Sequence, residues 1–389
     1  MSRQEKSSVL KDLFREYYEK AELDLPSDIE FREFAYQPFD SESYVRHLSF
    51  RTYDEVKNFF IQHVPLHLYF SSATYLSPAA EDMELKGWRG SDLLFDIDSD
   101  HIKKCVENKL VKKFRICPEC EILSEEPENE CPQCSGETID YIDPECLKYA
   151  EEVALDVVDI LVEEIGIDKR FITVSFSGNR GFHIRVTDER LRSLDRDSRR
   201  IIAGFIKASN MHLPMIKIDE KYLVLPPRVV DGGVRRRVAN RLLREIIEPE
   251  LREYILSSGH VKKDLIKRID KDLLQRYSKY YSDYAETPID EMVTMDISRL
   301  VRIPNSINGK SGLLTKKIDL NELGDIEFVL EKFSPFHDRT AVIEVRYKLP
   351  KIRLLDEEFK TSGRGLYHVR LPVAIYLELK NIGRIKKIL

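Results

Sequence analysis

Apolar positions along the chain recur with two periods, one typical of helices and one typical of strands. Residues 8–20 and 53–63 each carry one apolar face at helical spacing, which predicts helices docked on a core. Residues 146–165 repeat this pattern, and Gly166 is placed to end the helix. Short apolar runs of strand-forming residues lie at 66–75, 93–98, 171–176 and 182–186. Helices and strands therefore interleave, and we expect a mixed α/β fold of the α+β class, a β-sheet flanked by helices.

The pattern changes between residues 191 and 285, where helical spacing dominates and arginines accumulate. Five of these arginines lie close together, at Arg235, Arg236, Arg237, Arg241 and Arg244. Strand-like segments return at 340–347 and 367–371, so we expect the central sheet to resume there. The prediction is one domain formed by residues 1–190 and 286–389, interrupted by a helical subdomain at 191–285.

Composition bounds the class of protein but not its activity. The 389 residues are 42% hydrophobic and 33% charged, enough for a sizeable core under a charged surface. No run approaches a membrane span and the N-terminus is polar, so we expect a cytoplasmic protein that does not contact membranes. The net charge is −6, so any site for nucleic acid must be a local basic groove.

The strand expected at 93–98 carries two aspartates. Alternation sends Phe95 and Ile97 to the core, and Asp96 and Asp98 to the opposite face. Two carboxylates so close repel each other unless a cation lies between them, and hard oxygen ligands suit Mg²⁺ or Mn²⁺. A solvated strand edge remains the simpler interpretation of this motif when it is taken alone.

Residues 175–186 predict a strand, a glycine-bounded turn and a second strand. His183 and Arg185 share one face of the second strand, while Ser177, Asn179 and Arg180 occupy the turn. Exposed N–H groups beside a guanidinium suit an anionic triphosphate. A hairpin with a polar face is the alternative.

A third polar segment runs from Asp290 to Gly312. Its Gly-Lys-Ser sequence at 309–311 resembles part of a P-loop, but Pro304 occupies the position of the first P-loop glycine. A carboxylate and two arginines before a loop rich in Pro and Gly instead indicate a third metal ligand beside cations that bind phosphate.

Cysteine spacing indicates a separate metal site. Cys117, Cys120, Cys131 and Cys134 form two Cys-x2-Cys knuckles across a short loop, which is typical of a structural tetrahedral Zn²⁺ site. We expect a zinc-binding insertion at 104–137. Cys105 and Cys146 are left over, and we expect both to be buried and structural.

These segments, in this order, resemble the small catalytic subunit of DNA primases of the archaeal and eukaryotic type. The match covers most of the chain. It begins at Arg32-Glu33-Phe34 and at 44–50, continues through 95–98 and 177–183, and ends with 290–312. The insert at 191–285 matches poorly.

The resemblance implies roles for individual residues. Asp96, Asp98 and Asp290 would hold catalytic Mg²⁺ or Mn²⁺, and the nucleotide would be held by a set of polar and basic residues comprising Ser177, Asn179, Arg180, His183, Arg302, Asn308 and Lys310. This chain departs from the family at Asn179, where arginine is frequent, and at Asn308, where histidine is frequent. Both departures remove charge and keep hydrogen-bonding capacity.

The resemblance also implies a reaction and partners. The reaction would be template-directed primer synthesis on single-stranded DNA from NTPs or dNTPs, with release of pyrophosphate, for DNA replication. The partners would be a primase large subunit and other replication-fork proteins, near the nucleoid if the cell is archaeal. The arginines at 235–244 are a candidate template track, against a solvated helix face. Three alternatives stay open, namely a primase-like repair polymerase that extends DNA ends, a non-catalytic zinc-containing DNA-binding scaffold and a metal-dependent phosphohydrolase.

Overall fold

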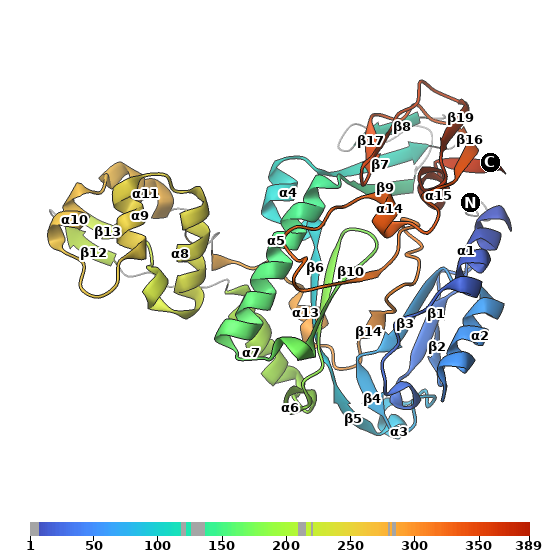
Figure 1. Ribbon diagram of the computed structural model, residues 1–389, viewed down its shortest axis with the longest axis horizontal. Coiled ribbons are helices and arrows are strands. Elements are labelled where there is room, and N and C mark those ends of the chain that lie inside the picture. Colours follow the sequence, from blue (N-terminus) through green and yellow to red (C-terminus); the bar gives the residue numbers. More distant parts are fainter. Residues whose placement is uncertain are drawn as a thin grey trace.

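The computed structural model describes residues 8–117, 122–125, 137–208, 215–218, 221–278, 281 and 285–389. Figure 1 shows a large body that contains the N- and C-terminal regions, and a smaller lobe at one end of the molecule. Two four-stranded antiparallel sheets form the centre of the body. One buried apolar cluster runs through the elements of both sheets, from Leu10 to Ile385.

The first sheet has the order β14-β3-β1-β2. Its strands are β1 (Phe34–Gln37), β2 (Val45–Leu48), β3 (His67–Ser71) and β14 (Leu300–Arg302). Helices α1 (Ser8–Lys20) and α2 (Tyr53–His63) lie beside it (Figure 1). The Thr52 hydroxyl caps α2 by accepting from the Glu55 N–H, and Val64 ends the helix in a left-handed conformation. Strand β14 joins this sheet from a distant part of the sequence, so Arg302 lies opposite Tyr69.

The second sheet has the order β15-β10-β11-β6. Its strands are β6 (Leu93–Asp98), β10 (Ile172–Phe176), β11 (Gly181–Val186) and β15 (Lys316–Ile318). Helix α5 (Glu145–Asp159) packs against β6 and β11 and continues into a π-turn at Ile160–Glu164. Phe95 and Ile97 are buried on the helix side, and Asp96 and Asp98 are partly exposed, as strand alternation predicted.

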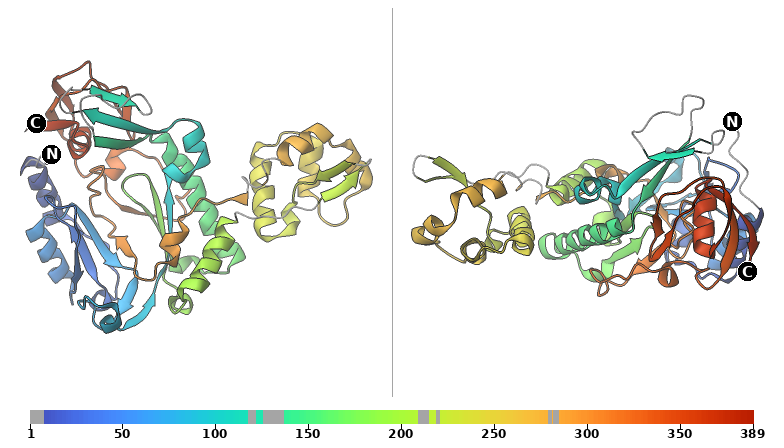
Figure 2. Two further views of the ribbon diagram at one scale, coloured as in Figure 1. Left: turned by 180° about the vertical axis from the view of Figure 1, so that it is seen from behind. Right: turned by 90° about the horizontal axis from the view of Figure 1, so that it is seen from above.

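The lobe has a core of its own, formed by buried residues from Leu225 to Ala285. Its described residues include a hairpin and the helices α8 to α11: β12 (Met215–Ile218), β13 (Lys221–Val224), α8 (Gly233–Glu245), α9 (Pro249–Leu256), α10 (Lys263–Arg268) and α11 (Lys271–Ser278). By contrast α7 (Arg196–Lys207), which the sequence interpretation assigned to the subdomain, buries Ala203 and Ile206 in the main core. The two views in Figure 2 show the lobe standing apart from the body.

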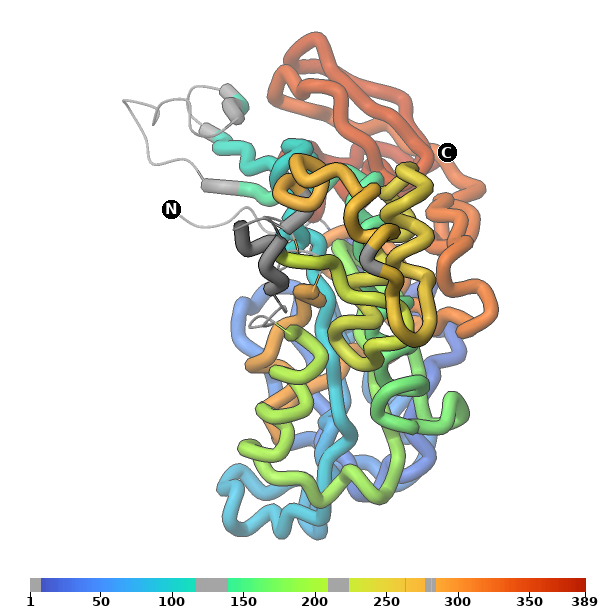
Figure 3. Tube along the Cα trace, turned by 90° about the vertical axis from the view of Figure 1, so that its left-hand side faces the viewer, coloured from blue at the N-terminus to red at the C-terminus, as the bar shows by residue number. Residues whose placement is uncertain are grey.

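The C-terminal strands form a sheet of their own instead of extending the central sheet, so that expectation was wrong. Strand β16 (Thr340–Val345) pairs with β19 (Gly365–Arg370) on one edge and β20 (Gly383–Ile388) on the other. Helix α15 (Leu371–Leu379), buried along its whole length, packs on this sheet. Both edges of β16 are filled by strands from its own C-terminal segment, so β16 has no free edge with which to join a central sheet. Figure 3 shows this sheet in red, at the opposite end of the body from β4 (Ala73–Tyr75) and β5 (Trp88–Ser91).

The expected zinc site lies largely outside the described residues. Strand β7 (Val111–Cys117) pairs with β8 (Ile122–Glu125) and β9 (Glu137–Ile142), while Cys120, Cys131 and Cys134 are not described. Cys105 and Cys146 are fully buried, and a disulfide joins them between α4 (Lys103–Glu107) and α5.

The remaining short elements are α3 (Met83–Lys86), α6 (Glu189–Arg192), α13 (Glu291–Met295), α14 (Leu330–Phe333), β17 (Ile352–Leu354) and β18 (Glu357–Phe359). Among the described residues, no helix is both long enough and apolar enough to cross a bilayer.

Candidate active site

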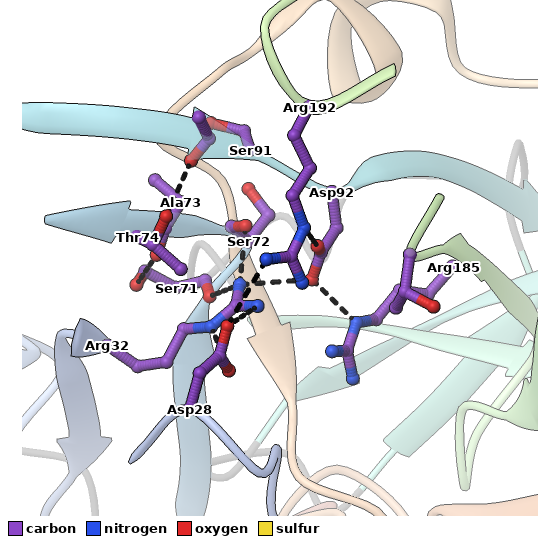
Figure 4. Close-up of polar contacts among 12 residues, drawn as sticks. Asp28, Arg32, Ser71, Ser72, Ala73, Thr74, Ser91, Asp92, Arg185 and Arg192 are labelled. Atoms are coloured by element: carbon purple, nitrogen blue, oxygen red, sulfur yellow. Dashed lines mark hydrogen bonds and ion pairs between the residues drawn. The ribbon is translucent and has the colours of Figure 1, made fainter. Parts of the chain in front are cut away.

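A buried ion network joins the two central sheets (Figure 4). The Asp92 carboxylate, which precedes β6, lies 3.0 Å from the guanidinium of Arg32, 2.8 Å from that of Arg185 and 3.1 Å from that of Arg192. Arg32 also donates to both oxygens of Asp28 at 2.8 Å and to the carbonyls of Ser71 and Ser72 at the end of β3. The start of β6 is therefore fixed against the end of β3, which sets the spacing between the sheets.

The two expected aspartates lie on the open face of the second sheet, next to β11. Asp96 is directly opposite His183, and Asp98 is opposite Gly181. The imidazole Nε2 of His183 lies 3.4 Å from Asp96 Oδ1. Only glycine fits at position 181, because a Cβ there would lie 1.7 Å from the Ile97 carbonyl oxygen. Close approach of β11 to β6 thus brings the imidazole against the carboxylate.

The electrostatics of Asp96 favour a cation. Burial raises the pKa of Asp96, His183 opposes this change, and the neighbouring carboxylates Asp98 and Asp290 raise the pKa further. Asp96 Oδ1 is also buried without a hydrogen-bond partner among the described residues. A buried carboxylate oxygen that makes no hydrogen bond and lies beside other acids is in an environment that a hard divalent cation stabilises, so these residues fit Mg²⁺ or Mn²⁺.

The backbone of Asp290 lies close to Asp96, but the Asp290 carboxylate is directed at the start of α13. Its N–H donates to the Asp96 carbonyl at 3.0 Å, and its carboxylate caps α13 by accepting from the Met292 N–H at 2.8 Å. Within the described part of the chain, no three acidic, His or Cys side chains are grouped tightly enough to hold a metal ion. A ligand role for Asp290 would therefore require its carboxylate to leave the helix cap.

The turn between β10 and β11 is built around Ser177. Its hydroxyl accepts from the N–H groups of Asn179 at 3.3 Å and Gly181 at 3.2 Å. The Arg180 guanidinium bridges Asp98 at 2.9 Å and Asp100 at 2.7 Å. This turn holds Arg180 at the carboxylate end of β6.

The loop after β14 packs onto the same turn. The Asn308 amide donates to the Ser177 carbonyl at 2.8 Å, and the Thr315 hydroxyl donates to the same oxygen at 3.1 Å. Asn308 Oδ1 accepts from the Lys310 N–H at 2.9 Å. The Asn308 side chain thus links the turn at Ser177 to the backbone of Lys310 and fixes the position of that backbone.

The first sheet supplies the opposite wall. Arg302 donates to the Tyr69 hydroxyl at 3.1 Å and contacts Nδ1 of His67. Tyr44 packs edge-on against the Tyr69 ring, with centroids 5.5 Å apart, and Arg46 pairs with the buried carboxylate of Glu33 at 3.1 Å.

Between these walls lies a cavity of about 470 Å³. Of the metal and nucleotide ligands expected from the sequence, Asp290 is the one that does not line this cavity. The others do: Asp96, Asp98, Ser177, Asn179, Arg180, His183, Arg302, Asn308 and Lys310. Its lining also includes Arg299, the second arginine that the sequence placed beside phosphate, and residues to which sequence analysis gave no individual role, namely Tyr44, Arg46, Tyr69, Asp296 and Ser298. Asp296 lies six positions after Asp290, and its Oδ1 is held by the N–H and hydroxyl of Ser298 at 2.9 and 2.8 Å.

Comparison with known proteins gives one consistent family. The family model for the DNA primase small subunit matches residues 124–320. The DNA primase small subunit PriS of Sulfurisphaera tokodaii is 38% identical over 98% of this chain and 98% of its own length. PriS of Staphylothermus marinus is 37% identical over 99% and 97% of the two chains. The chain belongs to the DNA primase small subunit family. It is therefore the catalytic subunit of a DNA primase, a nucleotidyltransferase that acts in DNA replication.

A solved structure aligns more weakly with this primase subunit. The polymerase domain of Mycobacterium tuberculosis ligase D in complex with DNA covers 84% of this chain and 88% of its own, at a TM-score of 0.36 and 12% identity. A likeness at this level carries no argument about the site.

The arginine cluster of this primase subunit lies away from the cavity. Arg237 pairs with Glu164 at 2.8 Å, and Arg241 pairs with Asp156 at 2.9 Å, so α8 is held against α5 and its π-turn. Arg237 also donates to the carbonyls of Phe205 and Ile206 on α7. These two arginines attach the lobe to the body.

Proposed function

We propose that this primase subunit makes short primers on a single-stranded DNA template by transferring nucleotidyl groups from NTPs. One observation supports this most directly. The cavity between the sheets has two carboxylates on one wall, Asp96 and Asp98, and faces basic side chains from three other segments, Arg180, Arg302 and Lys310. A nucleoside triphosphate with its divalent cations has the matching charges.

Asp96 and Asp98 would hold Mg²⁺ or Mn²⁺, with Asp290 as a further ligand. When bound, such ions would lower the pKa of the attacking hydroxyl and neutralise charge on the triphosphate. The primer's 3′-oxygen bonds to the α-phosphorus, the bond from that phosphorus to the bridging oxygen breaks, and pyrophosphate leaves. The hydroxyl proton passes to solvent, because no described side chain in the cavity is placed as an obvious base.

The protein's own contribution would be to bind and orient the triphosphate. Ser177 and Asn179 offer a turn held by internal hydrogen bonds, and Arg180 lies at its end. His67 and Tyr69 hold the Arg302 guanidinium, and the Asn308 side chain holds the backbone of Lys310. His183, 3.4 Å from Asp96, would oppose the rise that burial causes in the pKa of that carboxylate. Groups held in place before the nucleotide arrives lose little entropy on binding.

Two further parts of the proposal concern the whole assembly. The relatives' names describe small subunits, and we propose a large subunit as partner of this chain as well. We also propose that Cys117, Cys120, Cys131 and Cys134 hold a structural Zn²⁺ through their thiolates.

Incubation with single-stranded DNA, labelled ATP and Mn²⁺ tests the proposal. Template-dependent labelled oligomers are expected without a primer. Extension of supplied DNA ends only would favour a repair polymerase, free phosphate would favour a hydrolase, and no turnover would favour a scaffold.

Asp96→Asn should remove the oligomers. Asp325→Asn is the matched control, because Asp325 is exposed and does not line the cavity.

A further inference from the structure

A second, smaller cavity of about 60 Å³ adjoins the candidate active site on the side away from the first sheet. The two cavities share Asn179, Arg180 and Lys310 as lining residues. The far wall of the second cavity comes from β9, the region of β17 and the end of α15. Its size admits a small ion and excludes a nucleoside.

Lys380 is the distinctive group in this second cavity. It follows α15, whose side chains are buried on every face, and its ammonium donates to the Asp140 carbonyl at 3.1 Å. Burial lowers the pKa of Lys380 to about 8. The Asp140 carboxylate opposes this change, and the cations Lys310 and Arg180 add to it. Lys380 is thus a half-buried cation near other cations.

Two lysines of this cavity lack an acidic partner. Neither Lys310 nor Lys380 has a carboxylate within ion-pair distance in the described part of the chain, whereas the two arginines of the lining each pair with two carboxylates. Among the described residues that line the cavity, Asp140 is the one acid beside four cations, Arg180, Lys310, Arg353 and Lys380. The half-buried ammonium of Lys380 is costly unless an anion compensates for it.

We propose that Lys310 and Lys380 form an exit subsite for the pyrophosphate released by nucleotidyl transfer. The inference rests on the proposed function, because that reaction supplies the anion. Arg180 and Lys310 border both cavities, so a polyanion leaving the active site can be passed from Arg180 and Lys310 to Lys380 without losing cationic contacts. Tyr376, Leu354 and Leu355 line the same cavity and keep Lys380 partly shielded from water, which strengthens its contact with phosphate.

Two measurements on the full-length chain test the subsite. The first is equilibrium binding of labelled pyrophosphate in the presence of Mg²⁺, and the second is inhibition of primer synthesis by added pyrophosphate. Lys380→Met should weaken both by about tenfold, the loss of roughly one charge-assisted hydrogen bond. Lys380→Arg keeps the positive charge, so it should retain most of the wild-type pyrophosphate binding and inhibition. Lys387→Met, an exposed lysine on β20, is the matched control and should leave both constants unchanged.

The outcomes are distinguishable. Unchanged pyrophosphate binding and inhibition in Lys380→Met would overturn the subsite. A rise in the KM for the nucleotide as large as the weakening of pyrophosphate binding would also overturn it, because Lys380 would then contact the incoming triphosphate. Equal weakening of inorganic phosphate binding would make the subsite a general phosphate site and refute a role specific to pyrophosphate. If the wild-type chain makes no primers, the proposed function fails, whereas the equilibrium measurement still decides whether Lys380 binds pyrophosphate.

Discussion

Asp96 and His183 face each other across the β6–β11 pair, with 3.4 Å between the carboxylate Oδ1 and the imidazole Nε2. The contact joins a carboxylate whose pKa is raised by burial to a side chain that lowers that pKa. We therefore expect the ionisation of Asp96, and hence cation binding, to depend on His183.

Replacing Asp96 by Asn tests its role in catalysis. The amide keeps the size of the side chain but removes the charge that attracts a divalent cation, so primer synthesis should fall about 100-fold or more. Circular dichroism and Tm should stay close to wild type. Near wild-type synthesis at saturating Mn²⁺ would refute the assignment of Asp96.

Arg302 should act on the nucleotide and not on the template. A guanidinium on a partly desolvated phosphate contributes on the order of 1.5–3 kcal/mol, so Arg302→Ala should lower kcat/KM for the nucleotide about ten- to hundredfold. Affinity for single-stranded DNA should not change. Arg384→Ala, on an exposed position of β20, serves as control. Weaker DNA binding with normal nucleotide kinetics would reassign Arg302 to the template.

Asp92 should matter for stability more than any surface acid. Its removal leaves buried arginines without their partner, and breaking such a network costs about 3–5 kcal/mol. Asp92→Ala should therefore lower the free energy of unfolding by that amount, measured by denaturant titration. Glu358→Ala, which breaks an exposed pair with Lys351, should cost about 0–1 kcal/mol. Similar losses in the two variants would mean that the network contributes little.

Asp28 makes part of this stability depend on pH. Burial alone would raise the pKa of Asp28, but the hydrogen bond and charge of Arg32, with help from Arg192, hold the pKa below its usual value. A carboxyl whose pKa is lowered by folding stabilises the protein above its unfolded pKa of about 3.9, and this contribution is lost as pH falls further through the folded pKa. The Tm difference between wild type and Asp28→Asn should thus be largest near neutrality and shrink below about pH 4. A Tm difference that stays the same across this pH range would show that the ionisation of Asp28 is not coupled to folding.

Zinc should be present in a one-to-one ratio with the protein. Metal-binding energy in a small loop is largely folding energy, so removing Zn²⁺ should increase hydrogen exchange at residues 104–137 more than at the active site. Elemental analysis of protein purified without chelator, followed by exchange measurements, checks this. Protein that contains no zinc would refute the expectation.

The local parts of the site could be predicted because they depend on strand alternation. A period of two places Asp96 and Asp98 on one face of β6, and His183 and Arg185 on one face of β11, without any distant contact. The pairing that brings His183 opposite Asp96 joins segments far apart in the chain. Membership in the primase family, inferred from the same segments, is confirmed by the family model and by full-length relatives.

Other features depended on long-range contacts that periodicity does not encode. Asp290 and Asp296 lie on either side of the short helix α13, and only the position of that helix against β6 and α7 decides which one lines the cavity. The arginines on α8 looked available for nucleic acid, whereas Arg237 and Arg241 find acidic partners on α5 and its π-turn, more than 70 residues earlier.

The strands that complete both central sheets come late in the chain. Strand β14 closes the first sheet at residues 300–302, and β15 closes the second at residues 316–318. During synthesis on the ribosome, the carboxylates of β6 therefore emerge about 200 residues before the basic wall that faces them. A nascent or prematurely terminated chain that lacks these strands cannot assemble the cavity between the sheets, and therefore lacks the proposed nucleotide site.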